Sequence, residues 1–228
     1  MAGRLSSAGK IVGVAGLCAV VWIGAPPLLR GLEFFRVRRV EITGLQYLEP
    51  SKVIAALRLS PKASVFDDPA PLARRIMALP GVTSAEVGRQ VPGTLVLEMD
   101  EAVPVALTAR GDALAMVDAA GRVLPFDPVA SAPDLPLAAV PDAVVAGVLE
   151  TVRGSDLDLF GRIDATWRVG PDVVLEVDGR RLWFGARASA EDIRAVMAVA
   201  QALARQGRAY QELDGRVAGQ VIVRGARA

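Results

Sequence analysis

The uncharged run Ile11–Leu29 constrains what this chain can fold into more than any other feature. It reads IVGVAGLCAVVWIGAPPLL and has a charged residue on either side. About 20 apolar residues are what a helix needs to cross the hydrocarbon core of a bilayer. Pro26 and Pro27 are expected to end the regular helix near the far side. We therefore predict a transmembrane helix over residues 11–30, preceded by a short cytoplasmic tail over residues 1–10.

A cleaved signal peptide is the alternative interpretation of the same run. Arg4 and Lys10 form a positive region ahead of the apolar stretch, as in secretory signals. Cleavage after Ala25 would place Ile23 where a small residue is preferred and Pro26 directly after the cut, which favours a retained anchor. Charge counting leaves the orientation open, but a long domain translocates largely regardless of charge, so we expect the carboxy-terminal part outside the cytoplasm.

Composition narrows the possible functions. The chain has 228 residues, of which 52% are hydrophobic, enough for packed cores. Its 26 basic and 25 acidic residues nearly cancel, which disfavours nucleic-acid binding. It has no histidine, the side chain used most often as a general base or metal ligand. Cys18 is the only cysteine, which excludes an internal disulfide and a thiolate metal cluster.

Residues 34–104 form the first predicted module after the apolar run. A strand of β-branched and arginine residues ends at Gly44, and Pro50 takes the first position of a short helix. A second helix starts at Asp68, which can cap it, and two strands follow, joined around residues 91–93. The predicted order is therefore strand, helix, helix, strand, strand.

Two acids in the last of these strands raise the question of catalysis. Glu98 and Asp100 lie on one face, while Leu95, Leu97 and Met99 point to the other, because side chains alternate along a strand. A spacing of roughly 7 Å along the strand overlaps the carboxylate separations of glycosidases. Any amphipathic strand gives the same spacing, however, and no aromatic or glycine-rich platform flanks it. We interpret both acids as a solvated face and assign no catalytic residue.

The run ALPGVTSAEVGRQVPGTLVLEMDEAVPVA carries a resemblance to a known family. It is similar to the polypeptide-transport-associated (POTRA) module of the bacterial cell-division family FtsQ, also called DivIB. The residues that match the family pattern are Leu79, Pro80, Val82, Ala85, Val87, Arg89, Pro92, Thr94, Leu95, Glu101, Pro104, Val105 and Ala106. Ala102 departs from it, since the family often has a basic residue there.

Residues 105–225 form a second module of mostly short strands. Asp118–Gly121 separates two apolar runs and indicates a hairpin, which resembles the hairpin after the POTRA module in the same family. A proline- and alanine-rich connector follows, and a helix is expected over Asp142–Arg153, with Gly154 as its stop. Asp178 and Gly179 separate two further strands with a pair suited to a type I′ turn.

Aromatic and capping residues refine this second module. Trp183 and Phe184 are adjacent in a strand, so one is expected in the core and the other in a surface or interface contact, rather than in a cofactor site. Ser189 and Asp192 have capping-box spacing ahead of an amphipathic helix. Its predicted apolar face consists of Ile193, Val196, Met197, Ala200 and Leu203.

Two closing strands are predicted, Leu213–Val217 and Gln220–Arg224, joined around Gly219. They resemble the closing pattern of the same family through Leu213, Asp214, Arg216, Val217, Val221, Val223 and Arg224. Gly215 stands where an apolar residue is usual, and a glycine within a strand often marks a bulge. Alternation places Val221 and Val223 on one face and Ile222 on the other.

The resemblance implies an α+β protein: an N-terminal transmembrane helix, a small POTRA module and a mostly antiparallel β domain with flanking helices. It implies a non-enzymatic single-span divisome protein of the plasma (inner) membrane at the division septum. Such a protein links early and late division components and helps to control septal peptidoglycan synthesis. No cofactor or metal is expected.

The implied partners are FtsB-like and FtsL-like single-span coiled-coil division proteins. They would add a strand to an exposed sheet edge, and other divisome members would contact the POTRA module. The partner-binding residues that the resemblance implies are Arg216, Val217, Gln220, Val221, Ile222, Val223 and Arg224. An ordinary closing strand without a partner is the simpler alternative.

Two other functions stay open at this point. A POTRA-bearing chaperone of polypeptide transport would be favoured by repeated POTRA modules or a long carboxy-terminal barrel. A membrane-anchored cell-wall hydrolase would use Glu98 and Asp100. Asp156 and Asp158 could bind a cation, but two carboxylates without further oxygen ligands make a weak site, so we interpret them as loop or strand-end residues.

Overall fold

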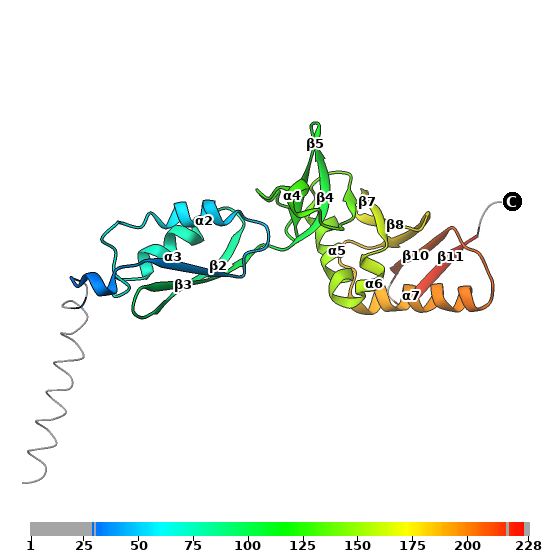
Figure 1. The fold of residues 1–228 in the computed structure, drawn as a ribbon. Helices are drawn as coiled ribbons and strands as arrows, with labels where there is room; N and C mark the ends of the chain where they lie inside the picture. The colour runs from blue at the N-terminus through cyan, green and yellow to red at the C-terminus, as the bar shows by residue number, and fades with distance from the viewer. Residues whose placement is uncertain (1–28, 30, 218, 226–228) are drawn as a thin grey trace, which may run out of the picture. The chain divides into compact units, whose positions relative to one another are not determined.

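A computed structural model describes residue 29, residues 31–217 and residues 219–225 (Figure 1). The predicted cytoplasmic tail and nearly all of the predicted membrane helix lie outside these residues. Within the part that is described, no helix is long and apolar enough to cross a membrane. The chain divides into two compact units, residues 1–101 and residues 102–228, each with its own core.

The first unit is built on a three-stranded sheet in the order β1-β3-β2. Strand β1 (Arg39–Thr43) lies parallel to the central strand β3 (Thr94–Glu101), and β2 (Val82–Gln90) pairs with β3 in the antiparallel direction. The predicted order of strand, helix, helix, strand, strand is confirmed.

Two short helices cover one face of this sheet (Figure 1). Helix α2 (Pro50–Leu57) starts at its proline, as predicted, and α3 (Ala70–Met77) has Pro69 at its N-cap. Asp68 lies one residue earlier than a capping residue, although its carboxylate still accepts a hydrogen bond from the Ala70 amide. A three-residue 3-10 turn, η1 (Glu33–Phe35), precedes β1.

The core of the first unit follows the alternation of β3. Leu95, Leu97 and Met99 are at most 5% exposed and contact Val53 and Leu57 of α2 and Ile76 of α3 within one cluster. Glu98 and Asp100 point to the opposite face and are exposed. The period of two along β3 therefore separates core from solvent as the sequence indicates.

Glu101 ends β3 on the same face as Leu95, Leu97 and Met99, so its carboxylate is buried. Oε2 accepts hydrogen bonds from the backbone amides of Gln46 (2.9 Å) and Tyr47 (2.6 Å), and Oε1 accepts one from the Leu48 amide (2.9 Å). Three backbone donors of the loop between β1 and α2 are thus satisfied by one side chain that is 8% exposed.

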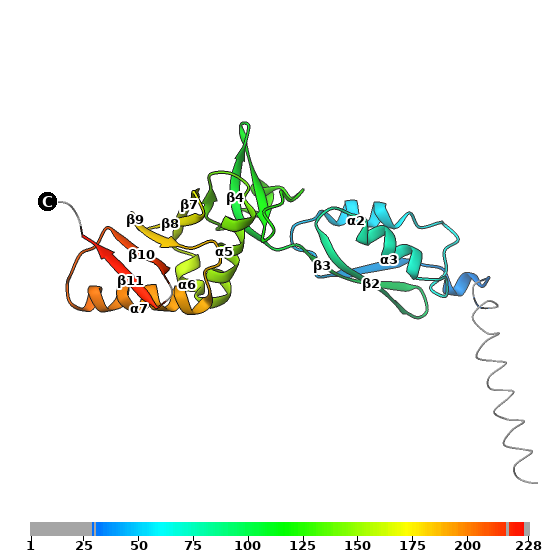
Figure 2. The same ribbon diagram turned by 180° about the vertical axis from the view of Figure 1, so that it is seen from behind.

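The second unit contains one eight-stranded sheet in the order β11-β10-β9-β8-β7-β6-β4-β5 (Figure 2). Its strands are β4 (Pro104–Arg110), β5 (Ala113–Asp118), β6 (Leu137–Ala138), β7 (Ile163–Val169), β8 (Asp172–Val177), β9 (Arg180–Phe184), β10 (Glu212–Val217) and β11 (Gln220–Arg224). Among these strands, four pairings are antiparallel and three are parallel, so the sheet is mixed.

The connector after β5 is more structured than its composition suggests. It holds a short helix, α4 (Pro128–Ser131), and the two-residue strand β6, which lies in the middle of the sheet between β4 and β7. The turn at Asp118–Gly121 leads only to a single bridge between Val117 and Val123, and the full hairpin is formed by β4 and β5. Two paired residues are too few to be recognised from a local pattern.

Helices α5 (Ala143–Ser155), α6 (Leu157–Phe160) and α7 (Ala190–Arg205) pack on one face of this sheet. Helix α5 continues through Gly154, so the predicted stop is wrong; Asp156 instead caps the next helix, and its carboxylate accepts a hydrogen bond from the Leu159 amide. The capping box of Ser189 and Asp192 at the start of α7 is confirmed. We refer to the sheet face away from these helices as the open face.

Candidate partner-binding edge

The hairpin of β10 and β11 forms one edge of the eight-stranded sheet. Gly219 lies in the turn with φ 73°, a conformation that favours glycine. The pairing is regular from Glu212 to Asp214 and then shifts before Val217, which confirms the predicted bulge. A Cβ atom on Gly215 would come within 2.4 Å of Val196 Cγ2 on α7, so the glycine also permits close packing of helix on strand.

The two faces of this hairpin differ in character. Leu213 is fully buried under α7 and pairs with Val223, while Val221 packs against the same core. On the open face, Ile222 pairs with Asp214 and is 50% exposed. The predicted division of Val221 and Val223 from Ile222 therefore holds.

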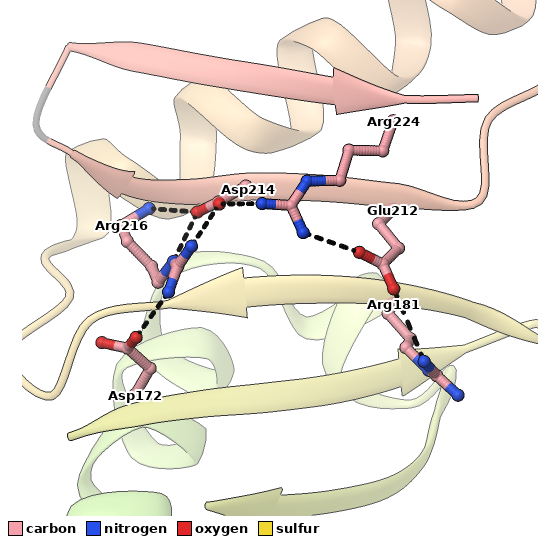
Figure 3. A network of polar contacts seen from close by, with 6 residues as sticks. All are labelled: Asp172, Arg181, Glu212, Asp214, Arg216 and Arg224. Atoms are coloured by element: carbon pink, nitrogen blue, oxygen red, sulfur yellow. Dashed lines mark hydrogen bonds and ion pairs between the residues drawn. The ribbon is translucent and has the colours of Figure 1, made fainter. Parts of the chain in front are cut away.

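Asp214 is the centre of a polar network on the open face (Figure 3). Its side chain is 4% exposed and accepts hydrogen bonds from Arg216 at 2.6 and 2.8 Å and from Arg224 at 3.3 Å. Arg216 also pairs with Asp172 of β8 at 2.7 Å. Hydrogen bonding by Arg216 lowers the pKa of Asp214, since it favours the charged carboxylate.

A second arm of the network crosses the same strands (Figure 3). Glu212 lies between Arg224, at 3.2 Å, and Arg181 of β9, at 3.5 Å. Arg224 thus bridges two acids of β10 from its position on β11. Three arginines and three acids take part, so the network carries no net charge and acts as a brace across β8, β9, β10 and β11.

The tryptophan of β9 lies beneath this brace. The guanidinium of Arg216 sits 5.2 Å from the centre of the Trp183 ring, a cation–π contact. Phe184 is fully buried on the other face. One aromatic in the core and one at the surface is what the adjacent pair predicts, and Trp183 helps to hold Arg216 against the sheet.

The seven predicted binding residues differ in how much surface they offer. Val217 is 55% exposed, Ile222 50% and Val223 39%, and Gln220 is exposed as well. Arg216 and Arg224 are half-buried or exposed and are engaged in the network. The structure therefore leaves exposed apolar side chains at the end of β10 and on both faces of β11, while the two arginines hold the hairpin together. Sequence reasoning missed Asp172, Arg181 and Glu212, because only strand pairing brings them to Arg216 and Arg224.

The other candidate acids do not assemble into a catalytic or metal site in the described residues. Glu98 is opposite Glu86 in the strand register, and Asp100 accepts a hydrogen bond from the Ser84 hydroxyl at 2.6 Å. A hollow of about 470 Å³ runs along this acidic face, but it is an open concavity of the sheet. No group of three or more histidine, cysteine, aspartate or glutamate side chains is placed to hold a metal in this part of the chain.

Comparison with known proteins gives a consistent assignment. Residues 35–101 match the family described as POTRA domain, FtsQ-type. The chain is 26% identical over 208 residues to the cell division protein FtsQ of Corynebacterium glutamicum, covering 88% of this chain and 89% of that protein. It is 36% identical over 129 residues to FtsQ of Rhodothermus marinus, covering 55% and 44%. The chain thus spans less than half the length of the R. marinus protein.

Among solved structures, the comparison finds the major extracytoplasmic domain of the cell division protein DivIB from Geobacillus stearothermophilus. It aligns over 46% of this chain and 97% of its own length, with 19% identity and a TM-score of 0.33, too low to compare folds. The FtsQ-type module, the strand, helix, helix, strand, strand order and the nearly full-length likeness to the C. glutamicum protein agree. Residues 35–101 form an FtsQ-type POTRA domain, and the chain as a whole is similar to the FtsQ/DivIB family of bacterial cell-division proteins.

Proposed function

We propose that this protein is a non-enzymatic, single-span scaffold of the divisome. It links early and late division components at the septum of the plasma (inner) membrane and helps to control septal peptidoglycan synthesis through protein contacts. The observation that carries the proposal is the exposed edge of β11. In this proposal the amino terminus of the chain lies in the cytoplasm, and the two described units lie outside the cytoplasm.

The edge of β11 is suited to strand addition. Strand β11 is the last of the eight in the sheet, with β10 on one side and no strand of the described chain on the other. Backbone groups along such an edge are open to pair with an added strand, and neighbouring side-chain pockets supply specificity. The exposed Val217, Ile222 and Val223 give the added strand an apolar surface to cover.

The proposed partners are FtsB-like and FtsL-like single-span coiled-coil proteins, which present an extended segment beside β11. Arg216, Val217, Gln220, Val221, Ile222, Val223 and Arg224 make up the proposed contact. Arg216 and Arg224 act by positioning, because the brace holds β11 against β10 before the partner arrives. Holding the edge in one conformation lowers the entropic cost of binding. The POTRA module contacts other divisome members.

Introducing a charge at an apolar position of the proposed contact provides the direct test. Ile222→Arg is expected to lower partner affinity at least about tenfold, since an apolar contact is replaced by a charge that must be desolvated. Ile222→Pro is expected to have a similar effect by disrupting an edge backbone contact. The measurement is in-cell photocrosslinking from single positions in residues 220–224, with mass spectrometry of the adducts.

Val169→Arg serves as the matched control, because Val169 is 43% exposed on the same sheet but lies on β7, away from the edge. Glu98 and Asp100 are the comparison positions for crosslinking. Capture of a small coiled-coil protein from β11, lost in Ile222→Arg and kept in Val169→Arg, is the expected result. Normal capture in Ile222→Arg would remove β11 from the proposal, and glycan adducts at Glu98 and Asp100 would direct attention to the POTRA sheet.

A further inference from the structure

One end of the first unit carries three exposed apolar side chains. Leu32 is 49% exposed, Phe34 61% and Val91 57%. Leu32 and Phe34 belong to η1 and its N-cap, whereas Val91 lies in the turn between β2 and β3. Figure 1 shows η1, in blue, and this turn at the same end of the unit, where the Gly93 carbonyl accepts a hydrogen bond from the Arg38 amide at 2.8 Å. Two segments that are distant in sequence therefore form one apolar surface.

Aromatic contacts hold η1 against the first unit. The Phe34 and Phe35 rings meet edge to face with their centres 5.1 Å apart, and Phe35 meets Phe66 in the same way at 5.0 Å. The guanidinium of Arg89, on β2, lies 5.9 Å from the centre of the Phe66 ring. Arg38 donates a hydrogen bond to the Phe34 carbonyl at 3.3 Å. The exposed Phe34 ring thus projects from a fixed support, and Arg89 belongs to the same end of the unit.

This end also carries positive charge. Arg38, Arg39 and Arg89 are all exposed. Among the described residues, the one ion pair that any of these three arginines makes joins Arg39 to Glu41 at 3.8 Å. Both partners of that pair are exposed, and exposed pairs of this kind are weak. The three arginines are therefore available to an anionic partner.

The acids nearest to this end are balanced by other arginines. Glu33 of η1 pairs with Arg36 at 2.8 Å. A separate hollow beside the loop between α2 and α3 is lined by two acids and two arginines, namely Asp67, Asp68, Arg58 and Arg75. The positive charge of the end is therefore not cancelled by its acidic neighbours.

The chain reaches this end directly from the apolar run of residues 11–29. The Leu32 amide donates a hydrogen bond to the Leu29 carbonyl at 3.2 Å, so the turn into η1 begins at the last residue of the run. The chain from Leu29 to Phe35 spans at most about 20 Å even when it is fully extended. No long linker separates the apolar run from the surface formed by η1 and the turn between β2 and β3.

We propose, on the basis of the single span in the proposed function, that this end of the first unit docks onto anionic lipid headgroups of the membrane that anchors the chain. The three apolar side chains enter the interfacial layer, and the three arginines lie against lipid phosphates. Val91 and Arg89 are the critical residues, because they are distant from the span in sequence and the anchor alone does not bring them to the lipid. Docking holds the first unit in one orientation on the membrane.

Quenching by lipid at single labelled positions provides the test. Full-length chains carry Cys18→Ser and one fluorescent label, on Gly31→Cys, Gln90→Cys or Gln46→Cys, all at exposed positions. They are reconstituted in nanodiscs of phosphatidylcholine alone or of an equal mixture with phosphatidylglycerol. A trace of lipid with a nitroxide on its headgroup quenches any label that lies in the headgroup layer.

The three labels report different things. Gly31 follows the apolar run and reports the span itself, whereas Gln90 stands beside Val91 and reports docking. Gln46 is the distant control, since its amide is bonded to Glu101 at the opposite end of β3. The eight residues of β3 place that end about 23 Å from the turn between β2 and β3.

The label at Gln90 is expected to be quenched in the mixed nanodiscs, and far less in phosphatidylcholine alone or at high salt, which screens the attraction. Arg89→Glu is expected to lower the ratio of docked to free protein at least about tenfold, because each basic side chain near an anionic surface contributes several-fold to binding. Lys52→Glu is the matched control. It makes the same change of charge at the start of α2, after the loop that Glu101 binds, and should leave the quenching unchanged.

Circular dichroism melting verifies that each variant is folded. Quenching at Gly31 with none at Gln90 would overturn docking and leave the span in place, whereas no quenching at Gly31 would remove the span and docking together. Equal quenching at Gln90 in both lipid compositions, or unchanged quenching in Arg89→Glu, would overturn the assignment to anionic headgroups. Photocrosslinks in cells from Gln90 to a protein, without quenching by lipid, would assign this end to that protein instead.

Discussion

Glu101→Ala is expected to destabilise the first unit by about 3–5 kcal/mol, a large part of the stability of a small domain. The substitution removes the acceptor of three backbone amides, those of Gln46, Tyr47 and Leu48. Hydrogen bonds to a charged acceptor contribute about 1.5–3 kcal/mol each, and buried donors left without a partner add a desolvation cost. The loop between β1 and α2 would lose its attachment to the end of β3.

Hydrogen exchange followed by mass spectrometry measures this effect locally. Peptides covering residues 46–48 should lose protection in Glu101→Ala, while peptides of β10 and β11 keep theirs. Glu101→Gln is the matched control, since it keeps the size and one good acceptor and should cost less than half as much. Glu98→Ala, on the exposed face of the same strand, should change the free energy of unfolding by under about 0.5 kcal/mol. Equal losses in Glu101→Ala and Glu98→Ala would contradict the assigned role.

Asp214→Ala is expected to destabilise the closing hairpin by about 2–3 kcal/mol and to weaken partner binding with it. The buried carboxylate is the shared partner of Arg216 and Arg224, and its removal leaves both guanidinium groups without their central acceptor. Because these arginines remain partly in contact with water, the loss is smaller than for a fully buried ion pair. Asp172→Ala, which removes only one arm, should cost under about 1 kcal/mol.

The same carboxylate predicts a pH dependence. The pKa of Asp214 is lower in the folded protein than in the unfolded chain, because Arg216 hydrogen-bonds to the charged form. Its contribution to stability is therefore present above the unfolded pKa of an aspartate and is lost as the pH falls through the folded pKa. The decrease in stability between neutral and acidic pH should be shallower in Asp214→Asn than in the unsubstituted protein.

Denaturant unfolding at a series of pH values, monitored by tryptophan fluorescence, measures both the loss of stability in Asp214→Ala and the pH dependence in Asp214→Asn. If stability decreases toward acidic pH as steeply in Asp214→Asn as in the unsubstituted protein, other carboxylates account for the decrease. Asp192 is one such group, because hydrogen bonds from Ser189 lower its pKa as well. Partner crosslinking from β11 in Asp214→Ala, compared with Ile222→Arg, then separates loss of the brace from loss of the contact.

Much of the fold can be predicted from local patterns in the sequence. Alternation along β3 assigns Leu95, Leu97 and Met99 to the core and Glu98 and Asp100 to solvent, because a strand has a side-chain period of two. Ser189 and Asp192 start α7 through hydrogen bonds that span only three residues. Gly215 indicates the bulge because a glycine within a strand weakens the local pairing, which is also a local effect. Each of these features depends on neighbours within a few positions.

Sequence alone therefore determined most of the helices and strands, their order and the faces they bury, but not α4, β6 or α6. Tertiary structure decided that β6 lies between β4 and β7, that Glu101 binds the loop amides and that Asp214 joins Arg216 to Arg224. It also brought Asp172, Arg181 and Glu212 into one network. These contacts depend on strand pairing over long sequence separations. The pattern of a single segment does not indicate which distant strand lies beside it.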